Sequence, residues 1–217
     1  MMNRGINHIG LTVPNIEEAT VFFKKGLDGK IAYDSQTKKD EPRGGEYVEH
    51  ILGLEKGASI IHKRMMVFGH GPNIEMFEFQ HAQQHEPQSL QDIGFTHISF
   101  YIENDAFEHV LERVKQAGGQ PLSEPHSNTK YEDTEGNKTV YIRAPWGSLI
   151  ELQTVPNGFY YPSDSEAKVF IPKSNNEWDS SFSNILSFST VTILCNFFET
   201  GYKLKEPKKR LNDSLEE

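Results

Sequence analysis

Residues 6–13 read INHIGLTV, and residues 95–102 repeat that pattern as FTHISFYI. The repeat places His8 on His97, and in both stretches apolar residues alternate with polar or small ones. Such alternation is typical of a strand that buries one face. A repeat of this kind predicts two copies of one structural module within the chain.

Each predicted strand is followed by a segment with helical spacing. Apolar residues recur at intervals of three and four over residues 16–23 and again over residues 107–114. Asn15, with Glu18 three positions later, is a predicted N-terminal cap for the first helix, and glycines follow both segments. We expect each helix to cover the apolar face of its own strand.

The end of each module is predicted from a second match, between GPNIEM at residues 71–76 and GSLIEL at residues 147–152, which places Glu75 on Glu151. The strands expected in the two copies, besides the first of each, lie near residues 30–33, 59–68 and 73–80, and near 120–122, 139–143 and 148–155. The predicted fold class is therefore α+β, with two tandem βαβββ modules whose curved sheets pair around one site.

The repeat also divides the chain into segments. These are a first module at 4–82 with an insertion near 34–54, a polar linker at 83–94, a second module at 95–161, and a C-terminal extension at 162–217 that matches neither copy. Within the insertion, the stretch YVEHILGL has the character of a short helix. The charged end of the extension is predicted to be partly disordered.

Composition narrows the function classes. The chain has 217 residues, 22 Lys plus Arg against 31 Asp plus Glu, and a net charge of −9, which disfavours nucleic acid as a partner. The single cysteine fits a reducing compartment. Residues 1–10 lack the apolar run of a secretion signal, and the apolar stretch at 185–198 is too short to span a bilayer. We expect a cytoplasmic protein with a small-molecule substrate and no membrane partner.

Two histidines and two glutamates recur at matching positions: His8 and His97 on the first strands, Glu75 and Glu151 on the last strands. Strand alternation places all four on the face opposite the helices. A lone strand histidine is more often a hydrogen-bonded polar residue, but paired placement of both residue types favours one divalent metal ion, such as Zn, Ni, Co, Mn or Fe. Four ligands around an octahedral ion leave two open positions, which favours catalysis.

Other residues are candidates for substrate contact or for a structural role. Tyr101, Tyr141 and Arg143 alternate towards the ligand side and are candidates for binding the substrate, with packing as an equal alternative. Phe77 is expected in the pocket wall or the core, and Glu78 on the helix side. Solvent-exposed or loop positions are expected for the histidines at 62, 70, 81, 85, 109 and 126.

The motifs NHIGLTV, GPNIEMFEF, FTHISFYI and VYIRAPWGSLIEL resemble those of the vicinal oxygen chelate superfamily, over residues 4 to about 161. That superfamily includes glyoxalase I, methylmalonyl-CoA epimerase, extradiol dioxygenases and the bleomycin and fosfomycin resistance proteins. The resemblance implies metal ligation by His8, Glu75, His97 and Glu151, the arrangement of bacterial-type glyoxalase I.

Two departures from the family pattern concern the substrate. Many members read D-P-x-G before the last strand, whereas this chain has Ala144-Pro-Trp-Gly147, so that the indole of Trp146 is expected at the pocket rim. The insertion at 34–54 is also longer than in compact glyoxalases. No set of residues that would bind glutathione as a co-substrate can be identified in the sequence.

These residues favour a metal-dependent lyase or isomerase of the glyoxalase and epimerase type. The predicted reaction is proton abstraction next to a carbonyl, with Glu151 or Glu75 as the base. Two alternatives stay open: an Fe(II) extradiol-type dioxygenase, which needs only one of the glutamates, and a binding or resistance protein without catalysis. Pairing of the modules within one chain and exchange between two chains of a homodimer also both stay open.

Overall fold

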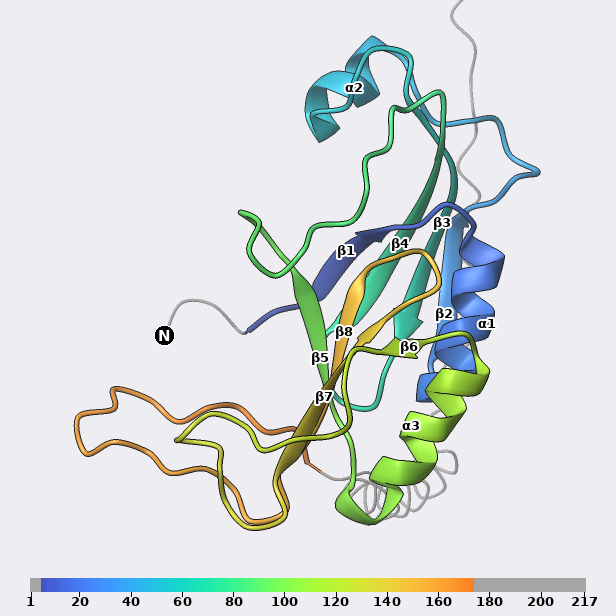
Figure 1. Cartoon of the computed structure of the whole chain (residues 1–217). Coiled ribbons are helices and arrows are strands. Elements are labelled where there is room, and N and C mark those ends of the chain that lie inside the picture. Colours follow the sequence, from blue (N-terminus) through green and yellow to red (C-terminus); the bar gives the residue numbers. More distant parts are fainter. Residues whose placement is uncertain (1–4, 174–217) are drawn as a thin grey trace, which may run out of the picture. The chain divides into compact units, whose positions relative to one another are not determined.

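The structure is a computed structural model that describes residues 5–173 (Figure 1). Residues 155–173, which follow the last strand, form neither helix nor strand. The predicted disordered end of the C-terminal extension lies outside the described residues. Within 5–173 no helix has the length and hydropathy to cross a membrane.

Both modules follow the predicted order of elements. The first comprises β1 (His8–Thr12), α1 (Ile16–Leu27), β2 (Lys30–Gln36), α2 (Glu46–Leu52), β3 (Ser59–Val67) and β4 (Asn73–Gln80). The second comprises β5 (His97–Tyr101), the short 3₁₀ helix η1 (Asn104–Ala106), α3 (Phe107–Gln116), β6 (Gln120–Pro121), β7 (Lys138–Arg143) and β8 (Leu149–Thr154). The helix expected in the insertion is α2.

Each module builds one four-stranded sheet, and the two sheets have the same topology. Their strand orders are β1-β4-β3-β2 and β5-β8-β7-β6, and in each the first strand runs parallel to the last. The register is also equivalent, because Gly10 lies opposite Glu75 and Ser99 lies opposite Glu151. The prediction of two βαβββ modules is confirmed.

One hydrophobic core joins the modules, and helices α1 and α3 lie side by side within it (Figure 1). The side chain of Asn15 caps α1 by accepting hydrogen bonds from the amides of Glu17 and Glu18, as the sequence predicts. A Cβ atom at Gly26 would lie only 3.0 Å from Cγ2 of Val114, so the glycine permits the close approach of the helices.

A polar contact fastens α3 to the end of α1. Arg113 Nε donates to the carbonyl oxygen of Lys25 at 2.8 Å, and its Nη1 donates to Asp28 at 2.9 Å. Asp28 is the C-cap of α1 and has a left-handed backbone, with φ 54°. The guanidinium therefore satisfies a helix-terminal carbonyl group and fixes the modules relative to each other.

Beneath the first sheet, on the side of α1, lies a network of buried charges. Arg64 is 5% exposed and donates to Asp34 at 2.7 and 2.9 Å and to Glu17 at 2.9 and 3.0 Å. These hydrogen bonds, which Arg64 donates, hold the pKa of Glu17 and of Asp34 below their usual values. Arg64 is thus a charged group inside the packing between sheet and helix.

Glu78 also lies on this side, as strand alternation predicts. It is 5% exposed, accepts a hydrogen bond from the amide of Ile16 at 2.9 Å, and pairs with Lys38 Nζ at 2.6 Å. A carboxylate at the first turn of α1 satisfies an amide that has no partner within the helix and complements the helix dipole.

The prediction of an exposed position for His62 is wrong. Its side chain is 5% exposed because β3 is an inner strand and His62 shares the helix-facing side with Arg64. Its Nε2 lies 3.6 Å from Asp34 Oδ1 and its Nδ1 lies 4.0 Å from Glu17 Oε1. Neither ring nitrogen has a hydrogen-bond partner among residues 5–173.

Candidate metal centre and pocket

The first predicted ligand pair lies on neighbouring strands of the first sheet. His8 Nε2 on β1 and Glu75 Oε2 on β4 are 3.5 Å apart. The other ring nitrogen of His8, Nδ1, lies 2.6 Å from Asn7 Oδ1, an acceptor, and this contact suits the tautomer that leaves Nε2 as the ligand. Lys63 Nζ on β3 pairs with Glu75 Oε1 at 2.8 Å.

The second pair repeats this geometry in the second sheet. His97 Nε2 on β5 and Glu151 Oε2 on β8 are 3.7 Å apart. Thr96, which precedes the histidine just as Asn7 does, lies 3.2 Å from its Nδ1. Glu151 Oε1, however, accepts a hydrogen bond of 2.7 Å from the hydroxyl of Thr139, where the first sheet has a lysine.

In each pair, the histidine and the glutamate have the chemistry and the spacing to bind the same divalent ion. Imidazole nitrogen and carboxylate oxygen are common ligands of Zn, Ni, Co, Mn and Fe. Two atoms that each lie about 2.1 Å from one ion are separated by about 3.4 Å at a tetrahedral angle. The separations of 3.5 and 3.7 Å therefore need only small side-chain rotations for a His and its Glu to reach the same ion.

A single centre of four ligands, expected from the sequence, is not formed within residues 5–173. No group of three or more His, Cys, Asp or Glu side chains there is placed to hold a metal ion. Each His–Glu pair lies in its own sheet, and the packing of the two sheets does not bring the pairs together. The described part of one chain therefore presents two separate half-sites of two ligands each.

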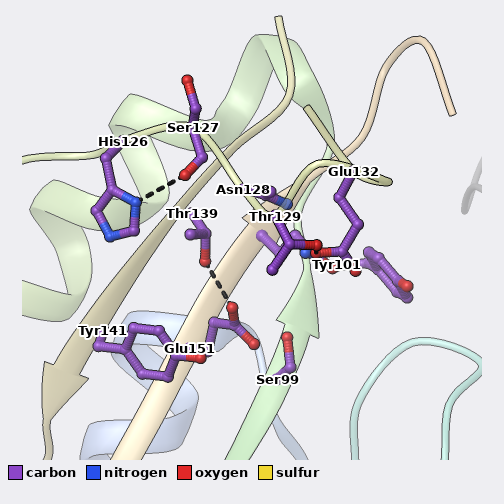
Figure 2. Close-up of a pocket in the computed structure, with 11 residues that line it drawn as sticks. Ser99, Tyr101, His126, Ser127, Asn128, Thr129, Glu132, Thr139, Tyr141 and Glu151 are labelled. Carbon is purple, nitrogen blue, oxygen red and sulfur yellow. Dashed lines mark hydrogen bonds between the residues drawn. The ribbon is translucent and has the colours of Figure 1, made fainter. Parts of the chain in front are cut away.

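Glu151 of the second half-site lines a pocket of about 560 Å³, whereas His97 lines a smaller pocket of about 110 Å³. Figure 2 shows Glu151, Thr139, Tyr141 and Ser99 on the strands, with a loop that carries Asn128 and its neighbours across them. The pocket is lined by Ser99, Tyr101, His126, Ser127, Asn128, Thr129, Glu132, Thr139, Tyr141, Glu151 and Gln153. His126, expected at an exposed or loop position, thus lies in a loop but also lines this pocket.

Two predicted substrate residues, Tyr101 and Tyr141, lie in this pocket. Burial of the phenol is the main cause that raises the pKa of Tyr101, and the negative charge of Glu132 raises it further. For Tyr141, burial is again the main cause of a raised pKa, and the negative charge of Glu151 adds to it. Both phenols are thus protonated hydrogen-bond donors at neutral pH, and the ring of Tyr141 packs edge-on against His97 with centroids 5.3 Å apart.

The other predicted substrate residues lie elsewhere. Phe77 stacks on Phe79 in the first sheet beneath Lys63, whose Nζ is 5.5 Å from the centroid of the Phe77 ring. Arg143 donates to the carbonyl oxygen of Gly147 at 3.1 Å and is not among the residues that line the pocket.

Trp146 is partly buried and packs against the core, and it does not line the 560 Å³ pocket. Its ring lies 5.3 Å from that of Phe22 and 5.4 Å from that of Phe23, measured between centroids. It also lines a smaller pocket of about 110 Å³ beside β1 and β5. The indole therefore fills space between the modules.

Several residues of the site were not found from the sequence. Asn7 and Thr96 precede the histidines at equivalent positions, and the repeat could have revealed them. Lys63 and Thr139 occupy equivalent positions beside the glutamates, but their contacts depend on strand register, which the alternating pattern does not fix. Asn128 lies in a loop without a motif.

Comparison with known proteins agrees with this architecture. A family model described as the Glyoxalase/Bleomycin resistance protein/Dioxygenase superfamily matches residues 5–152. Among solved structures, a glyoxalase family protein from Bacillus cereus superposes with a TM-score of 0.55 at 18% identity, over 74% of this chain and 97% of that one.

Two curated relatives are each 25% identical to the chain. One is a 2-epi-5-epi-valiolone epimerase of an Actinomyces species, aligned over 78% of this chain and 90% of the relative. The other is the metallothiol transferase FosB of Shouchella clausii (strain KSM-K16), aligned over 70% of this chain and 82% of the relative.

Proposed function

Since the chain belongs to the Glyoxalase/Bleomycin resistance protein/Dioxygenase superfamily, we propose that it is a divalent-metal-dependent isomerase of the epimerase type. The proposed reaction moves a proton next to a carbonyl group of a small substrate. The observation that carries the proposal is the duplicated His–Glu pair, whose second glutamate, Glu151, lines a pocket together with two protonated tyrosines. The similarity to an epimerase supports this reaction type over the transfer or lyase alternatives.

The metal ligands in this proposal are His8, Glu75, His97 and Glu151. Because each chain presents two half-sites, a complete site takes the first pair from one chain and the second pair from another, in a homodimer with two equivalent sites. A bound divalent ion would supply Lewis acidity to two neighbouring oxygens of the substrate.

Glu151 is the better placed of the two carboxylates to move the proton. A general base must reach the proton it abstracts, and Glu151 lines the pocket whereas Glu75 does not. Glu75 is instead held by the ion pair with Lys63. The Tyr141 phenol, beside Glu151, is placed to donate a hydrogen bond to the substrate oxygen that gains charge.

The test is metal content after recombining damaged half-sites. We consider one chain with His8→Ala and Glu75→Ala and a second with His97→Ala and Glu151→Ala, each with its own affinity tag. Neither homodimer retains a complete site. Heterodimers purified through both tags contain one intact site and one without ligands, so they are expected to bind about one ion per dimer, against about two for the unaltered protein.

A matched control pairs two differently tagged chains that both carry His8→Ala and Glu75→Ala. Every site in that dimer keeps only the two ligands of the second pair, so its metal content is expected to stay low. If the unaltered protein binds no divalent metal, the metal-dependent function is wrong. If it binds metal but the first heterodimer does not, the sharing of sites between chains is wrong.

A further inference from the structure

The pocket over the second sheet has a lining of hydroxyl, amide and carboxylate groups. None of the eleven described residues that line it is Lys or Arg, and two, Glu132 and Glu151, carry carboxylates. Hydroxyl groups come from strands and loop alike, for example from Ser99, Thr129 and Tyr101. Hydroxyls and amides both donate and accept hydrogen bonds, so this lining matches a ligand that does the same.

Asn128 is the pocket residue whose side chain makes no hydrogen bond to the described part of the chain. Its side-chain oxygen and nitrogen are both closed to solvent, and neither has a hydrogen-bond partner among the described residues. A buried amide without partners is costly, and such exceptions call for an explanation in function. Asn128 lines the pocket, so that a rotation of its side chain would present one of these atoms to a substrate hydroxyl.

The loop that carries Asn128 is fastened in place. His126 forms a β-bridge with Thr139 on β7, and Asn137 Nδ2 donates to the carbonyl oxygens of Glu132 and Gly158 at 2.7 Å each. The amide of Tyr160 donates to the carbonyl oxygen of Tyr131 at 2.7 Å. Because this loop is anchored on both sides, its polar groups are positioned before a ligand binds, which lowers the entropic cost of binding.

Glu132 sets the charge at the loop side of the pocket. It accepts a hydrogen bond from the hydroxyl of Thr129 at 3.2 Å, and its charge acts on both Tyr101 and Tyr141. Figure 2 shows its side chain close to Tyr101, away from Tyr141. An anionic substituent at this end would meet a carboxylate with no lining cation to offset it.

We propose that this pocket selects neutral, polyhydroxylated substrates and excludes those with a phosphate, sulfate or carboxylate group at the end away from the ligands. Asn128 recognises a substrate hydroxyl, and Glu132 accepts from another while repelling anions. The inference rests on the proposed function, since it names the substrate class of the same site. The net charge of the whole chain, −9, acts in the same direction.

The experiment measures binding of myo-inositol and of myo-inositol 1-sulfate to zinc-loaded protein by isothermal titration calorimetry. Both probes offer neighbouring hydroxyls, and the sulfate adds a negative charge while it coordinates metals weakly. Zinc content is determined first, so that loss of metal, which would overturn the proposed function, is distinguished from loss of probe binding. We expect the neutral probe to bind at least tenfold more tightly than the sulfate ester.

Two variants separate the roles of the lining residues. Asn128→Leu keeps the size of the side chain but removes its polar atoms, so we expect at least tenfold weaker binding of myo-inositol with zinc content and melting temperature maintained or increased. Glu132→Gln keeps the shape and removes the charge, so the preference for the neutral probe is expected to fall by about fivefold or more.

Four results would overturn the inference. The first is equal or tighter binding of the sulfate ester by the unaltered protein. The second is an Asn128→Leu variant that melts lower and binds myo-inositol normally, which would make Asn128 a structural residue. The third is a Glu132→Gln variant whose preference between the probes is unchanged. The fourth is failure of myo-inositol to bind zinc-loaded protein at all.

Discussion

The two modules have the same topology and the same His–Glu pair, yet they differ at the positions beside that pair. In the first sheet Lys63 contacts Glu75, whereas the equivalent Thr139 of the second sheet contacts Glu151. The described pocket of about 560 Å³ lies over the second sheet. Duplicated geometry thus preserves the ligand positions, while the surroundings of the two glutamates differ, since Glu151 lines the pocket and Glu75 is held in an ion pair.

The helix-facing sides of the sheets differ as well. The first sheet has the buried Arg64 there, and the second has Val140, which is 0% exposed, at the equivalent position. The charged network of the first module has no counterpart at this register position in the second. At this position the first module therefore buries a charged group between sheet and helix, whereas the second has apolar packing there. The polar pocket of the second module lies on the opposite face of its sheet.

The largest expected effect separates the two glutamates. Glu151→Gln should lower the rate of proton exchange by about 10²-fold or more, as for loss of a general base. Glu75→Gln should lower it less, because Glu75 is held in the ion pair with Lys63. The measurement is loss of the carbon-bound proton signal of dihydroxyacetone in D₂O by NMR with zinc-loaded protein. Equal losses in both variants would show that the modules do not differ in this role.

The next effect concerns the buried arginine. Arg64→Met should destabilise the fold by about 3 kcal/mol, because it leaves the carboxylate of Asp34, and His62 beside it, without the cation between sheet and helix. Glu17→Gln is the control, with an expected loss below about 1 kcal/mol because the Glu17 side chain is 61% exposed. Urea unfolding provides both values. A loss for Arg64→Met no larger than the control would contradict the network's role.

The smallest effect is the pH dependence of stability. Arg64 lowers the pKa of Glu17 and Asp34 from usual values of 4.5 and 3.8. Groups with a lowered pKa in the folded state stabilise it above the unfolded pKa, and that contribution is lost as the pH falls through the folded pKa. The melting temperature should therefore fall on acidification below about pH 5, and less steeply in Arg64→Met. If the melting temperatures of the unaltered protein and of Arg64→Met fall in parallel with pH, the lowered pKa values of Glu17 and Asp34 are not the cause of the pH dependence.

The repeat allowed much of the fold to be predicted, because each strand and helix has a clear apolar period. Helix α1 begins directly after Asn15 as expected, and β4 spans the predicted residues. The surroundings of His62 and Trp146 could not be predicted, for a common reason. Their surroundings are made by elements distant in the sequence, namely the carboxylates of Glu17 and Asp34 in one case and the rings of α1 in the other.

The candidate site was predictable only in part. The ligand positions follow from matched motifs, but whether the pairs converge depends on how the sheets pack, which no local pattern contains. The partners of the glutamates depend on register, and the amide of Asn128 is placed by a loop that contacts residues after β8. Long-range contacts of this kind are fixed by tertiary structure.

The shared core between α1 and α3 has a consequence for folding cooperativity. In linear repeat proteins, each unit contacts only its neighbours and stability is close to a sum over units. Here residues of both modules, such as Phe23 and Val114, belong to one buried cluster, so neither half can open without exposing the other. Protease cleavage in the linker at 83–94 should accordingly leave a nicked protein whose two fragments stay associated and melt in a single transition.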